Sequence, residues 1–252
     1  MPSTTAPAEA VFISDLHLSS RYPGRNELFF AFLDALPPTC RTIWILGDFF
    51  DFWIGPAHVQ IGEHRDVLHR LRGLTGSGIE VKFIWGNRDF QAGGELAKYA
   101  GLQVLGESAE ALFGPHRTLL IHGDSFCSRD TGHRVFRAVS RNRVMRALYR
   151  ALPAGMSMGI ARRLRARSEA SVAKKPKYKL SFAEEAIREA FGRGVDTIIC
   201  GHCHEARTEE FELGGRKGRL YTLGAWEESA AFLEYGGGEF RSRVFPEGAT
   251  AH

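Results

Sequence analysis

The chain has 252 residues, 44% of them hydrophobic and 25% charged, which is enough for one large buried core and ordinary for a soluble protein. No apolar run approaches the roughly 18 residues that cross a bilayer, and the longest candidate, residues 151–161, is far too short. The net charge of +4 at pH 7 hides an asymmetry: residues 134–179 hold 14 Lys or Arg and one acid, whereas the remainder holds 19 basic and 28 acidic residues.

The first ten residues, MPSTTAPAEA, lack the basic start and apolar centre of a signal peptide, so we expect a flexible tail over residues 1–10. Four cysteines in so long a chain do not make a disulfide framework, which favours a reducing compartment. The Cys200-x-x-Cys203 pair admits a zinc site. Alternation along a strand would turn the two side chains to opposite faces, however, which favours structural cysteines.

Five short apolar runs predict strands, and each run ends at Asp, Asn or His. They cover residues 11–14, 42–46, 81–85, 118–121 and 197–200. Their β-branched and aromatic residues are typical of strands covered on both faces. Four of the five have a glycine at that end, which lets the backbone turn sharply and lets a ligand approach closely.

Helical patterns lie between several of these runs. Residues 26–36 are apolar on one face, and residues 63–74 show a weaker period of 3.6. Ser181 and Glu184 predict a capping box at the start of another helix, which Gly192 or Gly194 can end. Alternating strands and helices predict an α/β sheet whose ligands gather at the carboxyl ends of the strands.

Seven side chains that can bind metals follow the five strands. They are Asp15, His17, Asp48, Asn87, His122, His202 and His204. His202 and His204 are two residues apart, so they project to the same side of an extended chain. Carboxylate, amide and imidazole ligands suit Mn²⁺, Fe²⁺ or Zn²⁺. Seven ligands exceed what one catalytic ion needs, so we expect two ions that share a carboxylate, with Asp48 as the bridge.

The motifs D-x-H, GD-x-x-D, GN-x-D, HGD and GH-x-H, in this order, resemble those of the calcineurin-like metallophosphoesterases. The resemblance implies a mixed α/β (α+β) fold, a β-sandwich of two mixed sheets flanked by helices. It also implies the distribution of the ligands. One ion would be held by Asp15, His17, Asp48 and His204, and the other by Asp48, Asn87, His122 and His202.

Arg88 stands where many members of this family have a histidine after Gly-Asn. An alkoxide leaving group needs a proton, whereas a phosphate, with a second pKa of roughly 6, can leave unprotonated. Arg88 can instead clamp phosphate oxygens and stabilise developing charge, which favours a pyrophosphate substrate. The alternative is a surface arginine paired with Asp89.

Three further motifs, GNRDF, HGDSFC-x-x-D and LGAW, are similar to those of the UDP-2,3-diacylglucosamine pyrophosphatases of lipid A synthesis, a Mn²⁺-dependent family. This resemblance implies two Mn²⁺ ions, with Fe²⁺ or Zn²⁺ as alternatives. It implies catalysis by Asp48, Asn87, Arg88 and His122. It also implies substrate contacts by Asn87, Arg88, Asp130, Ser168, Lys175 and His202.

The basic block predicts a helical lid over residues 126–180, inserted into a core of residues 11–125 and 181–246 and followed by a tail over residues 247–252. One stripe comprises Arg134, Arg137, Arg141, Arg146 and Arg150, and a second comprises Val135, Val139, Met145, Leu148 and Leu152. We expect two helices, broken at residues 153–155, whose apolar faces line an acyl-chain groove and whose arginines face phosphate or anionic head groups. The alternative is a packed helix pair with a solvated basic face; the near absence of aromatic residues disfavours nucleic acid.

The resemblance, together with the basic block, implies a cytoplasmic enzyme, peripheral on the inner face of the inner membrane, that acts on a nucleotide-linked acylated glucosamine and needs no obligate protein partner. Val172, Glu205-Ala206 and residues 56–58 depart from the narrower family's pattern, which leaves open a related enzyme with another diphosphate or phosphodiester substrate. A non-catalytic scaffold is the alternative from another class, because fold does not determine function. Such scaffolds typically lose ligands, and all seven are present here.

Overall fold

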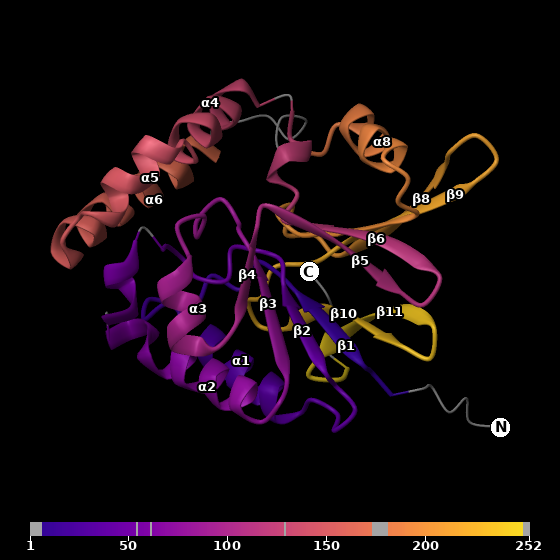
Figure 1. The fold of residues 1–252 in the computed structure, drawn as a ribbon, viewed down its shortest axis with the longest axis horizontal. Coiled ribbons are helices and arrows are strands. Elements are labelled where there is room, and N and C mark those ends of the chain that lie inside the picture. Colours follow the sequence, from indigo (N-terminus) through magenta and orange to yellow (C-terminus); the bar gives the residue numbers. More distant parts are fainter. Residues whose placement is uncertain (1–6, 54, 61, 129, 173–180, 249–252) are drawn as a thin grey trace.

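The computed structural model describes residues 7–53, 55–60, 62–128, 130–172 and 181–248. Two sheets face each other (Figure 1). The six-stranded sheet has the order β11 (Glu239–Phe245), β10 (Ala230–Gly236), β1 (Ala10–Ile13), β2 (Thr42–Ile45), β3 (Glu80–Ile84), β4 (Gln103–Gly106). The five-stranded sheet has the order β5 (Ser108–Phe113), β6 (His116–Ile121), β7 (Thr197–Cys200), β9 (Lys217–Thr222), β8 (Arg207–Glu212). The predicted strands are β1, β2, β3, β6 and β7, and the expected sandwich is confirmed.

The predicted strands lie at the centres of the sheets, so their carboxyl ends meet. β1, β2 and β3 are parallel, with Phe12 opposite Trp44, and β7 is parallel to both β6 and β9. Phe12, Trp44 and Ile199 belong to the core between the two sheets, whereas Val11 and Ile13 on the other face of β1 pack toward the helices. Both faces of these strands are therefore buried, which explains their unbroken apolar runs.

Helices cover the outer face of each sheet (Figure 1). The helices α1 (Pro23–Asp34), α2 (Arg65–Gly76) and α3 (Gly94–Ala100) lie on the six-stranded sheet, and α8 (Glu184–Gly192) lies on the other. Short 3₁₀ segments are η1 (Pro56–Gln60), η2 (Gly62–His64) and η3 (Asp124–Phe126). The predicted capping box is wrong, because α8 begins at Glu184 itself and its N-cap is Ala183, without a side-chain cap hydrogen bond.

Within the described residues, the basic block forms three helices rather than the two predicted. These are α4 (Thr131–Ser140), α5 (Arg143–Arg150) and α6 (Ala154–Val172), and Figure 1 shows them as one group at the edge of the molecule. The extra break occurs because Asn142 caps α5, its side chain accepting a 2.9 Å hydrogen bond from the backbone N–H of Val144. We call α4, α5 and α6 the lid; its domain boundaries stay a prediction.

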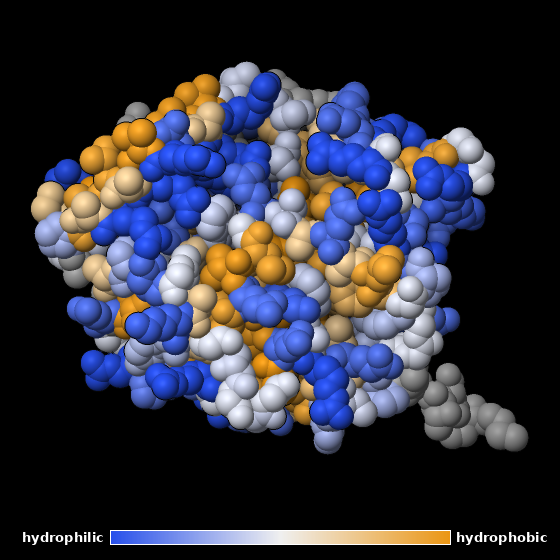
Figure 2. All heavy atoms as spheres, viewed as in Figure 1, coloured by the Kyte–Doolittle hydropathy of each residue, from blue (hydrophilic) through white to orange (hydrophobic). Residues whose placement is uncertain are grey.

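The faces of α4 and α5 are oriented opposite to the prediction. Val135, Val139 and Leu148 are 63%, 51% and 57% exposed, so they do not line an internal groove. Figure 2 shows apolar atoms on the outer surface where Figure 1 places these helices. Several of the arginines face inward because the core offers them partners, whereas Arg134 and Arg143 are exposed. Arg137 and Arg141 both pair with the buried carboxylate of Asp124, at 3.2 and 2.9 Å.

Two further arginines, both on α5, contact the core. The guanidinium of Arg146 lies 4.2 Å from the ring centroid of Trp85, and Arg150 forms an ion pair with Glu95. Arg141 also donates a 3.2 Å hydrogen bond to the carbonyl of Gly86, in the loop that follows β3. The lid is therefore attached to the core through its arginines, next to the strand ends.

Candidate metal centre

Backbone strain marks the strand ends. Among the described residues, the non-glycine residues with a positive φ are Asp15, His17, Asp48, His202 and His204, at 57°, 50°, 49°, 73° and 61°. All five belong to the seven predicted ligands. Such left-handed conformations cost free energy and persist where the surrounding structure enforces them, typically at functional sites. The backbone thus aims these side chains at a common point.

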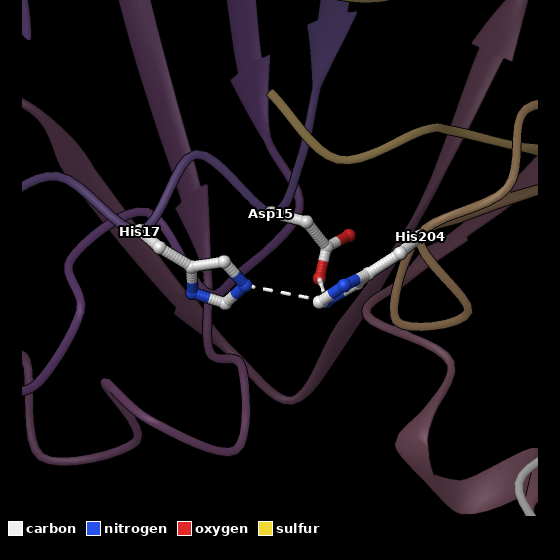
Figure 3. Close-up of side chains that lie close together, drawn as sticks. All are labelled: Asp15, His17 and His204. Atoms are coloured by element: carbon white, nitrogen blue, oxygen red, sulfur yellow. Dashed lines mark hydrogen bonds and ion pairs between the residues drawn. The ribbon is translucent and has the colours of Figure 1, made fainter. Parts of the chain in front are cut away.

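One cluster joins the end of β1 to the loop after β7 (Figure 3). The Nε2 atoms of His17 and His204 are 3.2 Å apart, and Nε2 of His204 lies 3.5 Å from Oδ1 of Asp15. Asp15 is completely buried, and His204 is exposed on one side. The carboxylate and the two imidazoles converge as ligands of one ion would.

The other predicted ligands lie beside this cluster. Asn87 Oδ1 is 3.1 Å from Nε2 of His122 and 3.0 Å from Nδ1 of His202. Nε2 of His122 also lies 3.6 Å from Oδ1 of Asp48. The atoms of Asp15, Asp48 and His122 form a second group that could hold a metal, so Asp15 belongs to both groups. All seven predicted side chains are therefore brought together, and their assignment as ligands is a proposal.

The charges and donors of this cluster fit bound cations. Burial acts to raise the pKa of Asp15, but the adjacent imidazole of His204 and the nearby histidines His122 and His17 hold it well below its usual value. Burial and the charge of Arg88 lower the pKa of His17, which favours the neutral imidazole that binds metals. Oδ1 of Asp15 and Nδ1 of His17 are buried without a hydrogen-bond partner, so both atoms remain available to bind a metal ion. Neither group that could hold a metal in the described part of the chain includes a cysteine.

Asp89 organises the loops around Asp48. It is completely buried, and its carboxylate accepts backbone hydrogen bonds from Gly86, Asp48, Phe49 and Phe50 at 2.8–3.3 Å. A Cβ atom at Gly86 would overlap the Asp48 carboxylate, which explains the glycine. The suggested pairing of Arg88 with Asp89 is wrong, because backbone donors occupy Asp89.

Arg88 points instead to two other carboxylates. Its Nε lies 3.6 Å from Oδ2 of Asp48, and its Nη1 lies 3.3 Å from Oδ1 of Asp51. Its backbone N–H donates to Oδ1 of Asp48 at 2.9 Å. The guanidinium therefore lies beside the cluster, where it can meet a phosphate. Asp51 and Asp124 were not among the predicted site residues, although the motifs GD-x-x-D and HGD contain both.

The remaining predicted substrate contacts lie on the lid side. Asp130 is buried immediately before α4. Ser168 lies in α6, where its side chain is not described, and Lys175 lies outside the described residues. A cavity of about 350 Å³ separates α6 from the loops after β1 and β2. Its wall combines apolar residues, such as Phe52 and Met158, with arginines, such as Arg165.

Comparison with known proteins gives consistent matches. The profile of the calcineurin-like phosphoesterase family matches residues 9–206. A UDP-2,3-diacylglucosamine hydrolase from Edwardsiella ictaluri is 36% identical, covering 88% of this chain and 86% of that protein. One from Ectopseudomonas mendocina is 32% identical, covering 93% and 97%. A solved archaeal phosphodiesterase superposes with a TM-score of 0.47 at 13% identity, covering 94% and 99%.

Proposed function

The chain belongs to the calcineurin-like phosphoesterase family, and on that basis we propose that it hydrolyses the diphosphate bond of UDP-2,3-diacylglucosamine to UMP and 2,3-diacylglucosamine 1-phosphate. The observation that carries this proposal is the similarity, along most of the chain, to hydrolases of that substrate. The position of Arg88 beside the metal centre supports it, because a guanidinium suits a substrate with two adjoining phosphates.

The family binds two metal ions. In our proposal the ligands are Asp15, His17, Asp48 and His204 for one ion and Asp48, Asn87, His122 and His202 for the other. Bound ions supply Lewis-acid stabilisation of phosphate oxygens and a nucleophilic water near neutral pH. We propose Mn²⁺, because the oxygen and imidazole ligands suit it.

The side chains around the centre have separate tasks in this proposal. Arg88 holds phosphate oxygens and stabilises the charge that develops on them, and Asn87 orients the same group. The leaving group is itself a phosphate, so it departs without a dedicated acid, and a histidine in place of Arg88 is not needed. Asp130, Ser168 and Lys175, together with His202, would contact the sugar phosphate.

The cavity beside α6 suits the acylated end of this substrate, because its wall is partly apolar and partly cationic. We further propose that the lid attaches the enzyme to the cytoplasmic face of the inner membrane. The exposed apolar side chains of α4 and α5 would enter the interface, and exposed Arg134 and Arg143 would meet anionic head groups. No helix in the described ranges is long and apolar enough to cross a bilayer.

Mass spectrometry of the products tests the proposal. With Mn²⁺, the enzyme should convert UDP-2,3-diacylglucosamine to UMP and the 1-phosphate much faster than it cleaves UDP-glucose or ADP-ribose. Asp48→Asn should abolish the reaction and serves as the inactive control. Faster cleavage of UDP-glucose or ADP-ribose would identify a related enzyme with another substrate. Absence of hydrolysis of these compounds and of an aryl phosphodiester, with metal bound, would favour a scaffold.

A further inference from the structure

Asp51 occupies a position between the metal centre and the lid. It follows β2 by a few residues and is buried, with 7% of its surface exposed. Its backbone N–H donates to the carbonyl of Leu18 at 3.1 Å. Two residues further on, the backbone N–H of Trp53 donates to the carbonyl of Arg88 at 3.0 Å. Backbone hydrogen bonds at Asp51 and Trp53 therefore fix the position of the loop that carries the Asp51 carboxylate.

Each oxygen of this carboxylate faces a different arginine. Oδ1 lies 3.3 Å from Nη1 of Arg88, and Oδ2 forms an ion pair with Nη1 of Arg165, in lid helix α6. Arg165 also donates a 3.2 Å hydrogen bond to the hydroxyl of Tyr22. Asp51 and Arg165 line the same cavity. One buried carboxylate thus joins the arginine of the metal centre to the lid.

Two carboxylates, those of Asp48 and Asp51, compete for the Arg88 guanidinium. Its Nε is 3.6 Å from Asp48, which we propose as a bridging metal ligand, and its Nη1 is closer to Asp51. Without the charge of Asp51, the guanidinium would be drawn entirely to Asp48. It would then neutralise a ligand carboxylate and turn away from an incoming phosphate. Asp51 is not in either group that could hold a metal among the described residues, so its carboxylate is available for this task.

We propose that Asp51 is a positioning residue: it holds the Arg88 guanidinium beside the metal centre and, through Arg165, makes that placement depend on the lid. The inference rests on the proposed function for the role of Arg88. A lid that moves away would take Arg165 with it and leave the whole Asp51 carboxylate to Arg88. With both oxygens of Asp51 drawing it, the guanidinium would shift away from the metal centre, so Arg88 is placed for phosphate only while α6 covers the cavity.

Kinetics of the full chain loaded with Mn²⁺ test this inference. Asp51→Asn should lower kcat roughly 10²-fold, the scale of a catalytic group misplaced by about 1 Å, while KM changes much less and the metal content stays the same. Asp51→Glu should give an intermediate kcat, because it restores the charge at a shifted position. Asp34→Asn is the matched control: it removes another ion-paired carboxylate, partner of Arg70 and 68% exposed, and should leave kcat unchanged.

The coupling to the lid is tested by a double-mutant cycle. Arg165→Gln should lower kcat several-fold in the wild-type background and have no further effect in Asp51→Asn. Equal effects in both backgrounds would overturn the coupling, and wild-type kcat in Asp51→Asn would overturn the positioning role. If Asp51→Asn does not fold, wild-type kcat in both Asp51→Glu and Arg165→Gln would overturn the inference. All variants are also assayed with bis(p-nitrophenyl) phosphate, so a wild type that cleaves only this diester refutes the proposed substrate and still tests Asp51.

Discussion

The outer face of the lid should bind membranes. Replacing two of its exposed apolar side chains should show how much free energy they contribute to that binding. Val144 and Leu148 lie one turn apart on α5 and are 67% and 57% exposed. Full burial of such a side chain is worth about 1.5–3 kcal/mol, so burying the exposed part of each contributes about 1 kcal/mol. Changing both to Gln should remove about 2 kcal/mol of binding free energy, which corresponds to roughly 30-fold weaker partitioning. Glutamine is a good helix former, so the helix should persist.

Co-sedimentation with vesicles that contain anionic phospholipid is the assay. The control is Leu112→Gln, which changes a 74% exposed leucine on β5, a strand that Figure 1 shows on the far side of the molecule from the lid. Added salt should weaken binding of the wild type, because exposed arginines contribute. Equal partitioning of Val144→Gln/Leu148→Gln and the wild type, or an equal loss in Leu112→Gln, would refute the assignment of this face.

Three further outcomes are expected. Asp48→Ala should lose both metal ions whereas His204→Ala keeps one, and elemental analysis with full occupancy in Asp48→Ala would contradict the bridging role. If the lid-side cavity holds acyl chains, each buried CH₂ should add about 0.8 kcal/mol, so diacylated UDP-glucosamine should have a far higher kcat/KM than the deacylated compound; equal values would favour a soluble nucleotide substrate. Burial lowers the pKa of His64 from 6.5 to about 4, so between pH 6.5 and 4 the unfolded chain binds more protons at this residue than the folded protein does. The free energy of unfolding should therefore fall by up to roughly 3 kcal/mol between pH 6.5 and 4. Urea titrations should show this loss reduced in His64→Phe and retained in His69→Phe, a change on the exposed face of α2.

The residues that meet at the candidate site could be predicted from the sequence because they follow a local pattern. A strand buried on both faces needs an unbroken apolar run, so a polar residue can appear only where the strand ends. Asp15, Asp48, Asn87 and His122 stand at such ends, and parallel neighbours bring such ends together. The order of the motifs then indicated the family, and the two-sheet fold followed from it.

The orientation of the lid was decided only by the tertiary structure. Periodicity shows that α4 and α5 have an arginine face and an apolar face, but it does not show which face turns inward. The core decides this, because Asp124 is buried and two arginines can satisfy its charge. A buried carboxylate without a cation costs far more than a few exposed valines. The role of Asp51 has the same origin. Its partners Arg88 and Arg165 are 37 and 114 residues away along the chain, and no local pattern connects them.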